Sequence, residues 1–312
     1  MTATLAIGPY SGIDVAGLKS AFDPFFLDKP ADISGLEQTI QSQITAVAFK
    51  GHASFDGGLM DMLPNLKLIA NYGVGYDAIN ITHANERGIK VTNTPDVLND
   101  DVADIAVGML LMQVREMSQA SEWARSGRWK NQGEYRLNRK FSGGRVGIVG
   151  LGRIGREIAN RLASFKMDIH YFARTSKPTP DWTYHDNPVA LAKAVDYLVV
   201  ALVGGPDTTK FVSREVIAAL NPNAIIVNIS RGSTIDEEAM LEALEAGKIG
   251  GAALDVFQNE PNIDPRFYDL HNVVIQPHQG SGTVETRADM AALQRDNIHA
   301  FVRGEKLVTP VN

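Results

Sequence analysis

The chain has 312 residues, of which 44% are hydrophobic and 21% charged, a composition typical of globular proteins with room for two domains. The formal net charge of −6 gives no general attraction to nucleic acid or anionic membranes, and no apolar run approaches the ~18 residues of a membrane span. The absence of cysteine excludes disulfides, thiolate catalysis and cysteine-bound metals.

Short apolar runs alternate with helical stretches in the N-terminal part of the chain. We expect strands at residues 4–7, 44–49, 66–70 and 89–91, and helices at residues 12–22, 55–63 and 79–87. Such alternation predicts a parallel sheet covered by helices.

A single long helix is expected next, at residues 101–125, because apolar residues recur there at helical spacing. Its apolar content is high almost all round, which suggests burial between domains or between subunits. The segment Ser126-Gly-Arg-Trp129 would end this helix, and residues 129–135 would form an irregular link.

A glycine motif follows a short apolar strand at residues 146–149. Gly150, Gly152 and Gly155 form G-x-G-x-x-G and lead into a helical pattern. The first glycine permits a tight turn, the second lets the backbone approach a pyrophosphate, and the third allows close packing of helix on strand. The helix start at Arg153 presents N–H groups and a positive dipole end to phosphates. Strand, glycines and helix in this order favour a dinucleotide site over a structural turn.

The end of the next expected strand, residues 168–172, indicates which dinucleotide binds. NAD-binding proteins carry an acid there, about 20 residues past the glycines, for the ribose 2′-hydroxyl. This chain has Ala173 instead, followed by two cations and two hydroxyls: Arg174, Thr175, Ser176 and Lys177. These side chains can bind a 2′-phosphate by charge-assisted hydrogen bonds. We expect NADP(H) in preference to NAD(H), against the alternative of a solvated basic turn.

The alternation of strands and helices resumes after the motif. Strands are expected at residues 168–172, 197–201, 224–229, 250–254 and 273–275. Helices are expected at residues 187–194, 213–219 and 236–246, and a last helix at 283–303. Two such blocks predict two α/β domains.

Three polar groups lie just beyond expected strands, at the edge where parallel α/β sheets bind ligands. Arg231 can bind a carboxylate through two hydrogen bonds, unless it forms a structural ion pair. Glu260 is a carboxylate held before a proline, and the alternative is an ordinary acid on the surface. His278 precedes a glycine-rich segment and belongs to the residue type that gives and accepts protons near neutrality. No set of histidines and carboxylates shows metal-ligand spacing.

Together these features resemble the D-isomer-specific 2-hydroxyacid dehydrogenases along nearly the whole chain. Within that family, the basic stretch at Arg174 looks most like the glyoxylate/hydroxypyruvate reductases. The matching motifs are Asn71-Tyr-Gly-Val-Gly-Tyr-Asp77, Thr92-Asn-Thr-Pro95, Gly147-Ile-Val-Gly-Leu-Gly-Arg-Ile-Gly155, Asn228-Ile-Ser-Arg-Gly232, Asp255-Val-Phe-Gln-Asn-Glu-Pro261 and Pro277-His-Gln-Gly-Ser281.

The resemblance implies a role for each group. Arg231 would bind the carboxylate and carbonyl of a 2-oxo acid, His278 would protonate the keto oxygen, and Glu260 would pair with His278. Backbone N–H groups of Val74 and Gly75 would hold the substrate carboxylate. Asp255 would bind the nicotinamide carboxamide within a larger set of cofactor contacts: Gly150, Gly152, Arg153, Ile154, Gly155, Arg174, Thr175, Ser176, Lys177, Val203, Pro206, Ile229, Asp255 and Gly280. No metal is implied.

The family resemblance also implies the architecture, with two Rossmann-like domains that contain parallel sheets. Residues 1–98 and 283–312 would form a flavodoxin-like substrate-binding domain, and residues 99–282 an inserted NAD(P)-binding domain. We further expect a homodimer through the helix from Asp101. A cytoplasmic location is expected because the N-terminus lacks the features of a signal peptide.

The implied function is NADPH-preferring reduction of glyoxylate or hydroxypyruvate to D-2-hydroxy acids. Another substrate, such as 3-phosphoglycerate, is disfavoured because the chain ends at Asn312 without an extra regulatory segment. Formate dehydrogenase is disfavoured because that branch lacks such a glutamate–histidine pair. A nucleotide-sensing regulator or corepressor of the same fold stays open, although it need not keep the arginine, glutamate and histidine together. Val203-Gly-Gly205 departs from the family pattern, which has a proline- and threonine-bearing segment near the nicotinamide.

Overall fold

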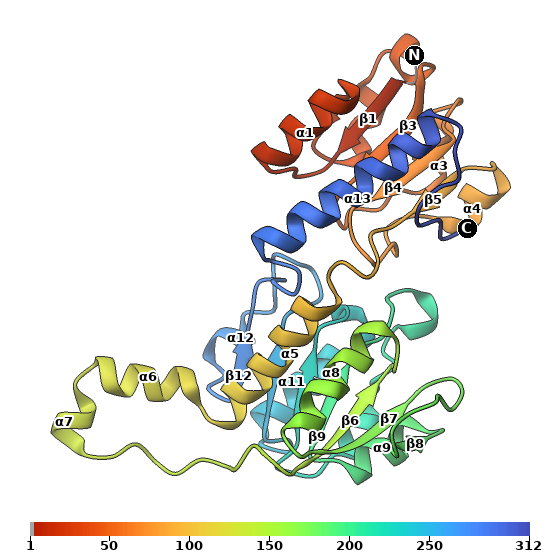
Figure 1. The fold of residues 1–312 in the computed structure, drawn as a ribbon. Helices are drawn as coiled ribbons and strands as arrows, with labels where there is room; N and C mark the ends of the chain where they lie inside the picture. Colours follow the sequence, from red (N-terminus) through yellow and green to blue (C-terminus); the bar gives the residue numbers. More distant parts are fainter. Residues whose placement is uncertain (1–2) are drawn as a thin grey trace. The chain divides into compact units, whose positions relative to one another are not determined.

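The computed structural model describes residues 3–312, which divide into two compact units (Figure 1). Unit 1 comprises Met1–Leu98 and Thr283–Asn312, and unit 2 comprises Asn99–Gly282. The second unit is therefore inserted into the first in sequence. No helix of the described residues is both long and apolar enough to cross a membrane.

Unit 1 contains a sheet of five parallel strands. The order is β2 (Phe25–Leu27), β1 (Ala3–Ile7), β3 (Ile44–Phe49), β4 (Leu68–Asn71) and β5 (Lys90–Thr92). This 2-1-3-4-5 order is the flavodoxin-like arrangement of doubly wound sheets. The edge strand β2 was not expected, because a strand of three partly exposed residues is too short to show a hydrophobic period.

Helices cover the sheet of unit 1: α1 (Gly12–Phe22), α2 (Gln38–Gln41), α3 (Gly57–Asp61), α4 (Ile81–Glu86), α13 (Val284–Val302) and the 3₁₀ turn η1 (Pro30–Gly35). Helix α13 starts at the N-cap Thr283 and buries Ile298 against the sheet. The amide of Gln294 donates to the carbonyls of Ala70, at 2.7 Å, and Phe49, at 3.3 Å. These bonds fix α13 to the carboxyl ends of β3 and β4.

Unit 2 contains seven parallel strands. The order is β12 (Val273–Ile275), β11 (Gly251–Leu254), β10 (Ile225–Asn228), β9 (Tyr197–Val200), β6 (Arg145–Val149), β7 (Asp168–Phe172) and β8 (Thr183–His185). Counted within the unit from the β8 edge, this is the 3-2-1-4-5-6 order of dinucleotide-binding folds with a seventh strand added. The predicted fold class, two α/β units with parallel sheets, is confirmed.

Both faces of this sheet carry helices: α5 (Asn99–Val114), α8 (Arg153–Ser164), α9 (Pro188–Ala194), α10 (Arg214–Ala218), α11 (Glu237–Glu245), α12 (Arg266–Asp269), and the 3₁₀ turns η2 (Pro206–Thr208) and η3 (Gly232–Thr234). Helix α5 packs against α8, β10 and β11 and buries Val102, Ala106 and Leu110 within its own unit. Packing on both sides explains why its sequence is apolar almost all round.

The single helix expected at residues 101–125 is wrong. Helix α5 ends at Val114, and α6 (Met117–Arg125) begins after Glu116, whose φ of 47° is left-handed and ends the regular run of hydrogen bonds. The expected irregular link also contains a short helix, α7 (Arg128–Gln132). In Figure 1, α6 and α7 project from the rest of unit 2. No glycine or proline marks the break at Glu116, so the sequence pattern did not reveal it.

Candidate active site

The glycine motif forms the turn between β6 and α8. Gly150 has a φ of 100°, and a β-carbon there would lie 2.7 Å from the carbonyl oxygen of Ala201. A β-carbon on Gly155 would lie 2.1 Å from the carbonyl oxygen of Gly150, so only glycine permits this closeness of helix and turn. Around Gly152, the N-cap of α8, a β-carbon would meet nothing within 4 Å. Open space in front of a helix N-terminus fits a pyrophosphate, with Arg153 and Ile154 supplying the first helical N–H groups.

The basic stretch follows β7. Ala173 is buried, whereas the side chains of Arg174, Thr175, Ser176 and Lys177 are exposed. The structure therefore presents the two cations and two hydroxyls to solvent beside the strand that neighbours β6.

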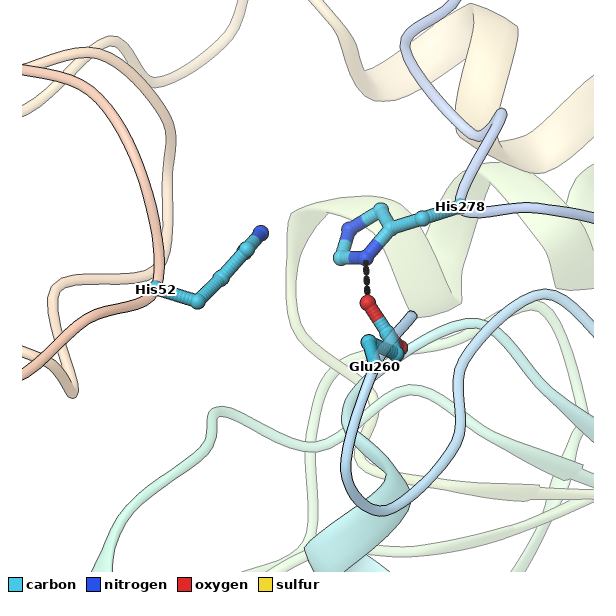
Figure 2. Close-up of side chains that lie close together, drawn as sticks. All are labelled: His52, Glu260 and His278. Carbon is cyan, nitrogen blue, oxygen red and sulfur yellow. Dashed lines mark hydrogen bonds and ion pairs between the residues drawn. The ribbon is translucent and has the colours of Figure 1, made fainter. Parts of the chain in front are cut away.

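Glu260 and His278 are hydrogen-bonded, with 2.7 Å between Nδ1 of the imidazole and Oε2 of the carboxylate (Figure 2). The other oxygen, Oε1, accepts from the N–H of Phe257 at 2.8 Å. The carboxylate is thus held from one side while its second oxygen faces the imidazole. The carboxylate therefore fixes the orientation of the imidazole ring through Nδ1.

Asp255 holds the backbone on which His278 lies. Its two carboxylate oxygens accept from the N–H groups of Gln279, at 2.6 Å, and Gly280, at 2.8 Å, and its carbonyl accepts from the His278 N–H at 3.0 Å. Burial raises the pKa of the Asp255 carboxyl, and the two N–H donors oppose that rise. Sequence analysis assigned Asp255 only to the nicotinamide carboxamide and missed this anchoring. The sequence feature that could have indicated this anchoring role is an aspartate placed directly after the buried strand β11.

Arg231 lies in a turn shaped by Asn228 at the end of β10. The Asn228 amide donates to the Arg231 carbonyl at 2.9 Å, and its oxygen accepts from the Ser230 N–H at 3.0 Å. Because β10, β11 and β12 are neighbours, the turns bearing Arg231, Glu260 and His278 follow adjacent strands of one sheet. The structure therefore brings these groups to one edge.

Gly232 lets the Arg231 turn pack directly on the segment before Glu260. A β-carbon on Gly232 would lie 2.0 Å from the carbonyl carbon of Phe257 and 2.3 Å from the nitrogen of Gln258. No side chain fits there without displacing one backbone from the other.

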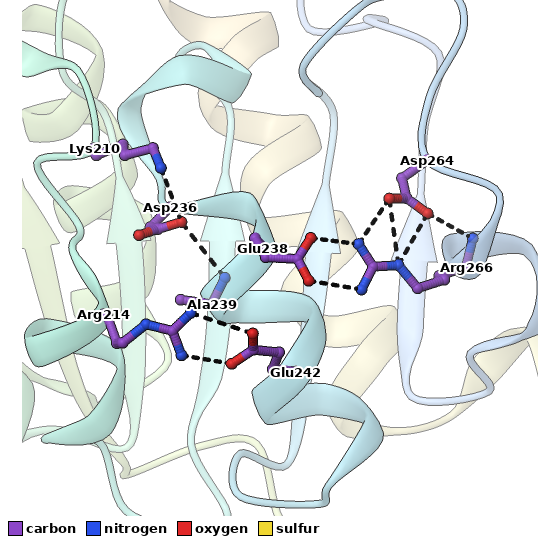
Figure 3. Close-up of polar contacts among 8 residues, drawn as sticks. All are labelled: Lys210, Arg214, Asp236, Glu238, Ala239, Glu242, Asp264 and Arg266. Carbon is purple, nitrogen blue, oxygen red and sulfur yellow. Dashed lines mark hydrogen bonds and ion pairs between the residues drawn. The ribbon is translucent and has the colours of Figure 1, made fainter.

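Glu237, at the start of α11, also fastens the Glu260 segment. Its carboxylate accepts from the Gln258 N–H at 2.9 Å, and burial raises the pKa of Glu237. Beyond Glu260, Arg266 pairs with Asp264 at 2.8 Å and with Glu238 of α11 at 2.6 Å (Figure 3). Figure 3 shows that the same helix is tied to its other neighbours through Lys210–Asp236 and Arg214–Glu242. The segment that carries Glu260 is thus attached to α11 at both ends.

The loop with Val74 and Gly75 belongs to unit 1 and follows β4. Asn71 donates to the carbonyls of Gly73, at 3.1 Å, and Gly75, at 2.8 Å, while Asn93 donates to the carbonyl of Val74 at 2.9 Å. Within residues 3–312, the N–H groups of Val74 and Gly75 have no hydrogen-bond acceptor. The carbonyl oxygens of this loop already accept from side chains, whereas its two N–H groups can still donate. This arrangement suits a carboxylate ligand.

The other predicted cofactor residues follow strands of unit 2. Val203 is 62% exposed in the loop after β9, where Thr208 donates to its carbonyl at 2.6 Å, and Pro206 begins η2. Ile229 is buried directly after β10, and Gly280 is buried beside Asp255. These residues lie at the same strand ends as the glycine turn.

Comparison with known proteins identifies relatives of the whole chain. Residues 107–280 match the family profile described as "D-isomer specific 2-hydroxyacid dehydrogenase, NAD binding domain". A hydroxyphenylpyruvate reductase from Plectranthus scutellarioides is 46% identical over 268 residues, which cover 86% of this chain and 85% of that protein. A glyoxylate/hydroxypyruvate reductase from Arabidopsis thaliana is 45% identical over 278 residues, which cover 89% of this chain and 88% of the relative.

A similar solved structure is an NADPH-dependent glyoxylate/hydroxypyruvate reductase from Sinorhizobium meliloti in complex with NADP and malonate. It is 38% identical, with a TM-score of 0.94, and the match covers 100% of this chain and 97% of that one.

The close packing at Gly232 gives a structural prediction. Gly232→Ala should displace the segment before Glu260 and lower the free energy of unfolding by about 1–3 kcal/mol, as overpacking does. Urea unfolding measures the loss, and hydrogen–deuterium exchange of residues 255–261 should increase. Gly108→Ala, at an exposed helical position with open space, is the control and should stabilise slightly. Equal stability of the two variants would contradict the packing argument.

Proposed function

The chain belongs to the D-isomer-specific 2-hydroxyacid dehydrogenase family, and on this premise we propose that it is an NADPH-preferring reductase of small 2-oxo acids. The products would be D-2-hydroxy acids, with glyoxylate and hydroxypyruvate as the first candidate substrates. The observation that carries the proposal is the Glu260–His278 pair, whose residues follow β11 and β12, next to the strand β10 that leads to Arg231. The names of the relatives support the substrate class.

The proposed chemistry needs a cation and a proton donor beside the substrate carbonyl. A nicotinamide cofactor, when bound, would supply the hydride for the carbonyl carbon. Arg231 would bind the substrate carboxylate and polarise the carbonyl, because negative charge grows on its oxygen. His278 would give that oxygen its proton from Nε2, and Glu260 would hold the imidazole in place through Nδ1. The contact of the Val74 and Gly75 N–H groups with a substrate carboxylate stays a prediction.

The cofactor preference is proposed from the end of β7. A nicotinamide cofactor follows from family membership and the glycine turn. The choice of NADP(H) is supported by Ala173 in place of an acid, by the exposed Arg174 and Lys177, and by the NADP complex of the Sinorhizobium meliloti relative. The cytoplasmic location expected from the sequence stays a prediction.

Turnover of oxo acids tests the proposal directly. Loss of NADPH absorbance should accompany reduction of glyoxylate and hydroxypyruvate, and kcat/KM should be higher with NADPH than with NADH. Arg231→Ala and His278→Ala should each lower kcat/KM by about a hundredfold or more. Pyruvate, phenylpyruvate and 3-phosphohydroxypyruvate in the same assay separate the substrate alternatives. Cofactor binding without turnover of any oxo acid would favour the regulator instead.

The Glu260–His278 pair predicts an effect on catalysis. Glu260→Ala removes the acceptor that bonds Nδ1 of His278, so the imidazole is no longer held in one orientation, and kcat/KM should fall about tenfold or more. Glu245→Ala, a surface change on α11, is the control and should leave kcat/KM unchanged. Wild-type kcat/KM in Glu260→Ala would refute the pairing as a catalytic device.

We also propose a homodimer, with a different contact from the one expected. The apolar residues of α5 are buried inside unit 2, whereas the arm, residues 117–137, exposes Met117, Trp129 and Leu137. Such apolar groups on a projecting segment are typical of an interface. Light scattering at micromolar concentration should give twice the chain mass of 33.9 kDa. Trp129→Ser with Leu137→Ser should shift the mass toward that of one chain, and a wild-type monomer would overturn the proposal.

A further inference from the structure

The basic stretch proposed to select the cofactor has a backbone held by side chains from three neighbouring elements. We call residues 173–178 the selector loop. Its polar residues 174–177 are exposed, yet its backbone is hydrogen-bonded to Tyr171 of β7, Tyr184 of β8 and Arg156 of α8. Sequence analysis assigned none of these three residues a role.

Tyr171 fixes the middle of the selector loop. Its side chain is only 1% exposed, and its hydroxyl accepts from the N–H of Lys177 at 2.9 Å. The same hydroxyl lies 3.1 Å from the Lys177 carbonyl oxygen, to which it donates, and 3.3 Å from Oγ of Ser176. One buried phenol therefore satisfies both backbone groups of Lys177 and reaches the preceding hydroxyl side chain.

The two ends of the selector loop are fixed from opposite neighbours. Tyr184 donates to the carbonyl of Ala173 at 3.3 Å, and its ring contacts that of Tyr171, with 5.4 Å between centroids. Arg156 donates to the carbonyl of Pro178 at 3.0 Å, and its guanidinium lies 5.8 Å from the ring of Trp182. Since Arg156 is on α8, the helix expected to meet the pyrophosphate is bonded to the loop expected to meet the 2′-phosphate.

This arrangement bears on selectivity because binding an anion on a loose loop would require ordering that loop. A loop fixed before binding keeps its cations and hydroxyls in place and loses less conformational freedom in the complex. This gain in affinity applies to a ligand that forms hydrogen bonds with these side chains, namely one with a 2′-phosphate. A ligand with a plain ribose 2′-hydroxyl gains little from it.

We propose that Tyr171, Tyr184 and Arg156 are positioning residues that preorganise the selector loop for a 2′-phosphate and so set the preference for NADPH over NADH. The inference rests on the proposed NADP(H) preference and extends it from the exposed cations to the residues behind them. It makes selectivity a property of the buried strand residue as well as of Arg174.

Calorimetric titration with two adenine nucleotides tests the inference without turnover. 2′,5′-ADP carries the 2′-phosphate, and 5′-AMP lacks it. Tyr171→Phe removes one hydroxyl from an otherwise unchanged ring, and it should weaken 2′,5′-ADP binding about tenfold while 5′-AMP binding stays within about twofold. Tyr268→Phe, at a 64% exposed position on α12, is the matched control and should change neither.

Enzyme kinetics and a double-mutant cycle separate positioning from a general structural effect. In Tyr171→Phe, KM for NADPH should rise about tenfold while KM for NADH and both kcat values stay within about twofold. Because Tyr171 holds the backbone of Lys177, its effect on 2′,5′-ADP affinity should shrink to about twofold or less in the Lys177→Ala background. Equal loss of affinity for both nucleotides, or no loss for either, would overturn the inference.

Two further results keep the inference apart from the proposed function. If the wild-type protein binds 2′,5′-ADP no more tightly than 5′-AMP, the proposed cofactor preference itself fails. If the wild type discriminates and Tyr171→Phe discriminates equally well, only the positioning role fails. Should Tyr171→Phe melt far below the wild type, Tyr184→Phe on the edge strand β8 replaces it, with the same selective loss expected.

Discussion

The hydrogen bond between Glu260 and His278 is the interaction on which the proposed chemistry depends, and most of the polar structure around it serves to hold it. At 2.7 Å, the carboxylate and imidazole form a short hydrogen bond that fixes the orientation of the ring. Neither group is on a regular element. Glu260 is kept in place by the Phe257 N–H, and the His278 segment by the buried carboxylate of Asp255.

This dependence explains why polar residues without a direct part in the reaction are bonded to the segments around the site. Glu237 bonds the backbone before Glu260, and Arg266 ties the backbone after it to α11. Exposed ion pairs contribute little to stability individually, so their effect here is to restrict where one segment lies. The proposed cofactor contacts lie at a different part of the same sheet edge, where Gly150, Gly152 and Gly155 shape a turn and a helix start.

Features that are determined by a few consecutive residues could be predicted from the sequence. The strand–glycine–helix turn needs Gly150 and Gly155 for reasons visible in a few residues, and the alternation of strands and helices predicted both sheets. The break at Glu116 could not be predicted, because no glycine or proline marks its left-handed backbone. The short edge strands β2 and β8 have too few residues to show a period and exist through pairing with β1 and β7.

The candidate site also has residues that could be predicted and supporting contacts that could not. Arg231, Glu260 and His278 were singled out because each follows an expected strand, and adjacent strand order then brings their turns together. Their supports were missed, since the anchoring by Asp255, the contact at Gly232 and the tie from Glu237 join segments far apart in sequence. Tyr171 was read as a strand residue, and only the folded loop shows what its hydroxyl bonds.

The central claim is that this chain delivers a hydride from NADPH to C2 of a 2-oxo acid while His278 protonates the oxygen. Reduction of hydroxypyruvate with NADPH deuterated at C4 of the nicotinamide, on the face that transfers, measures this most directly. The account predicts D-glycerate with one deuterium at C2, and no such product from His278→Ala above about one hundredth of the wild-type rate. An L-configured product, or glycerate without deuterium at C2, would contradict it.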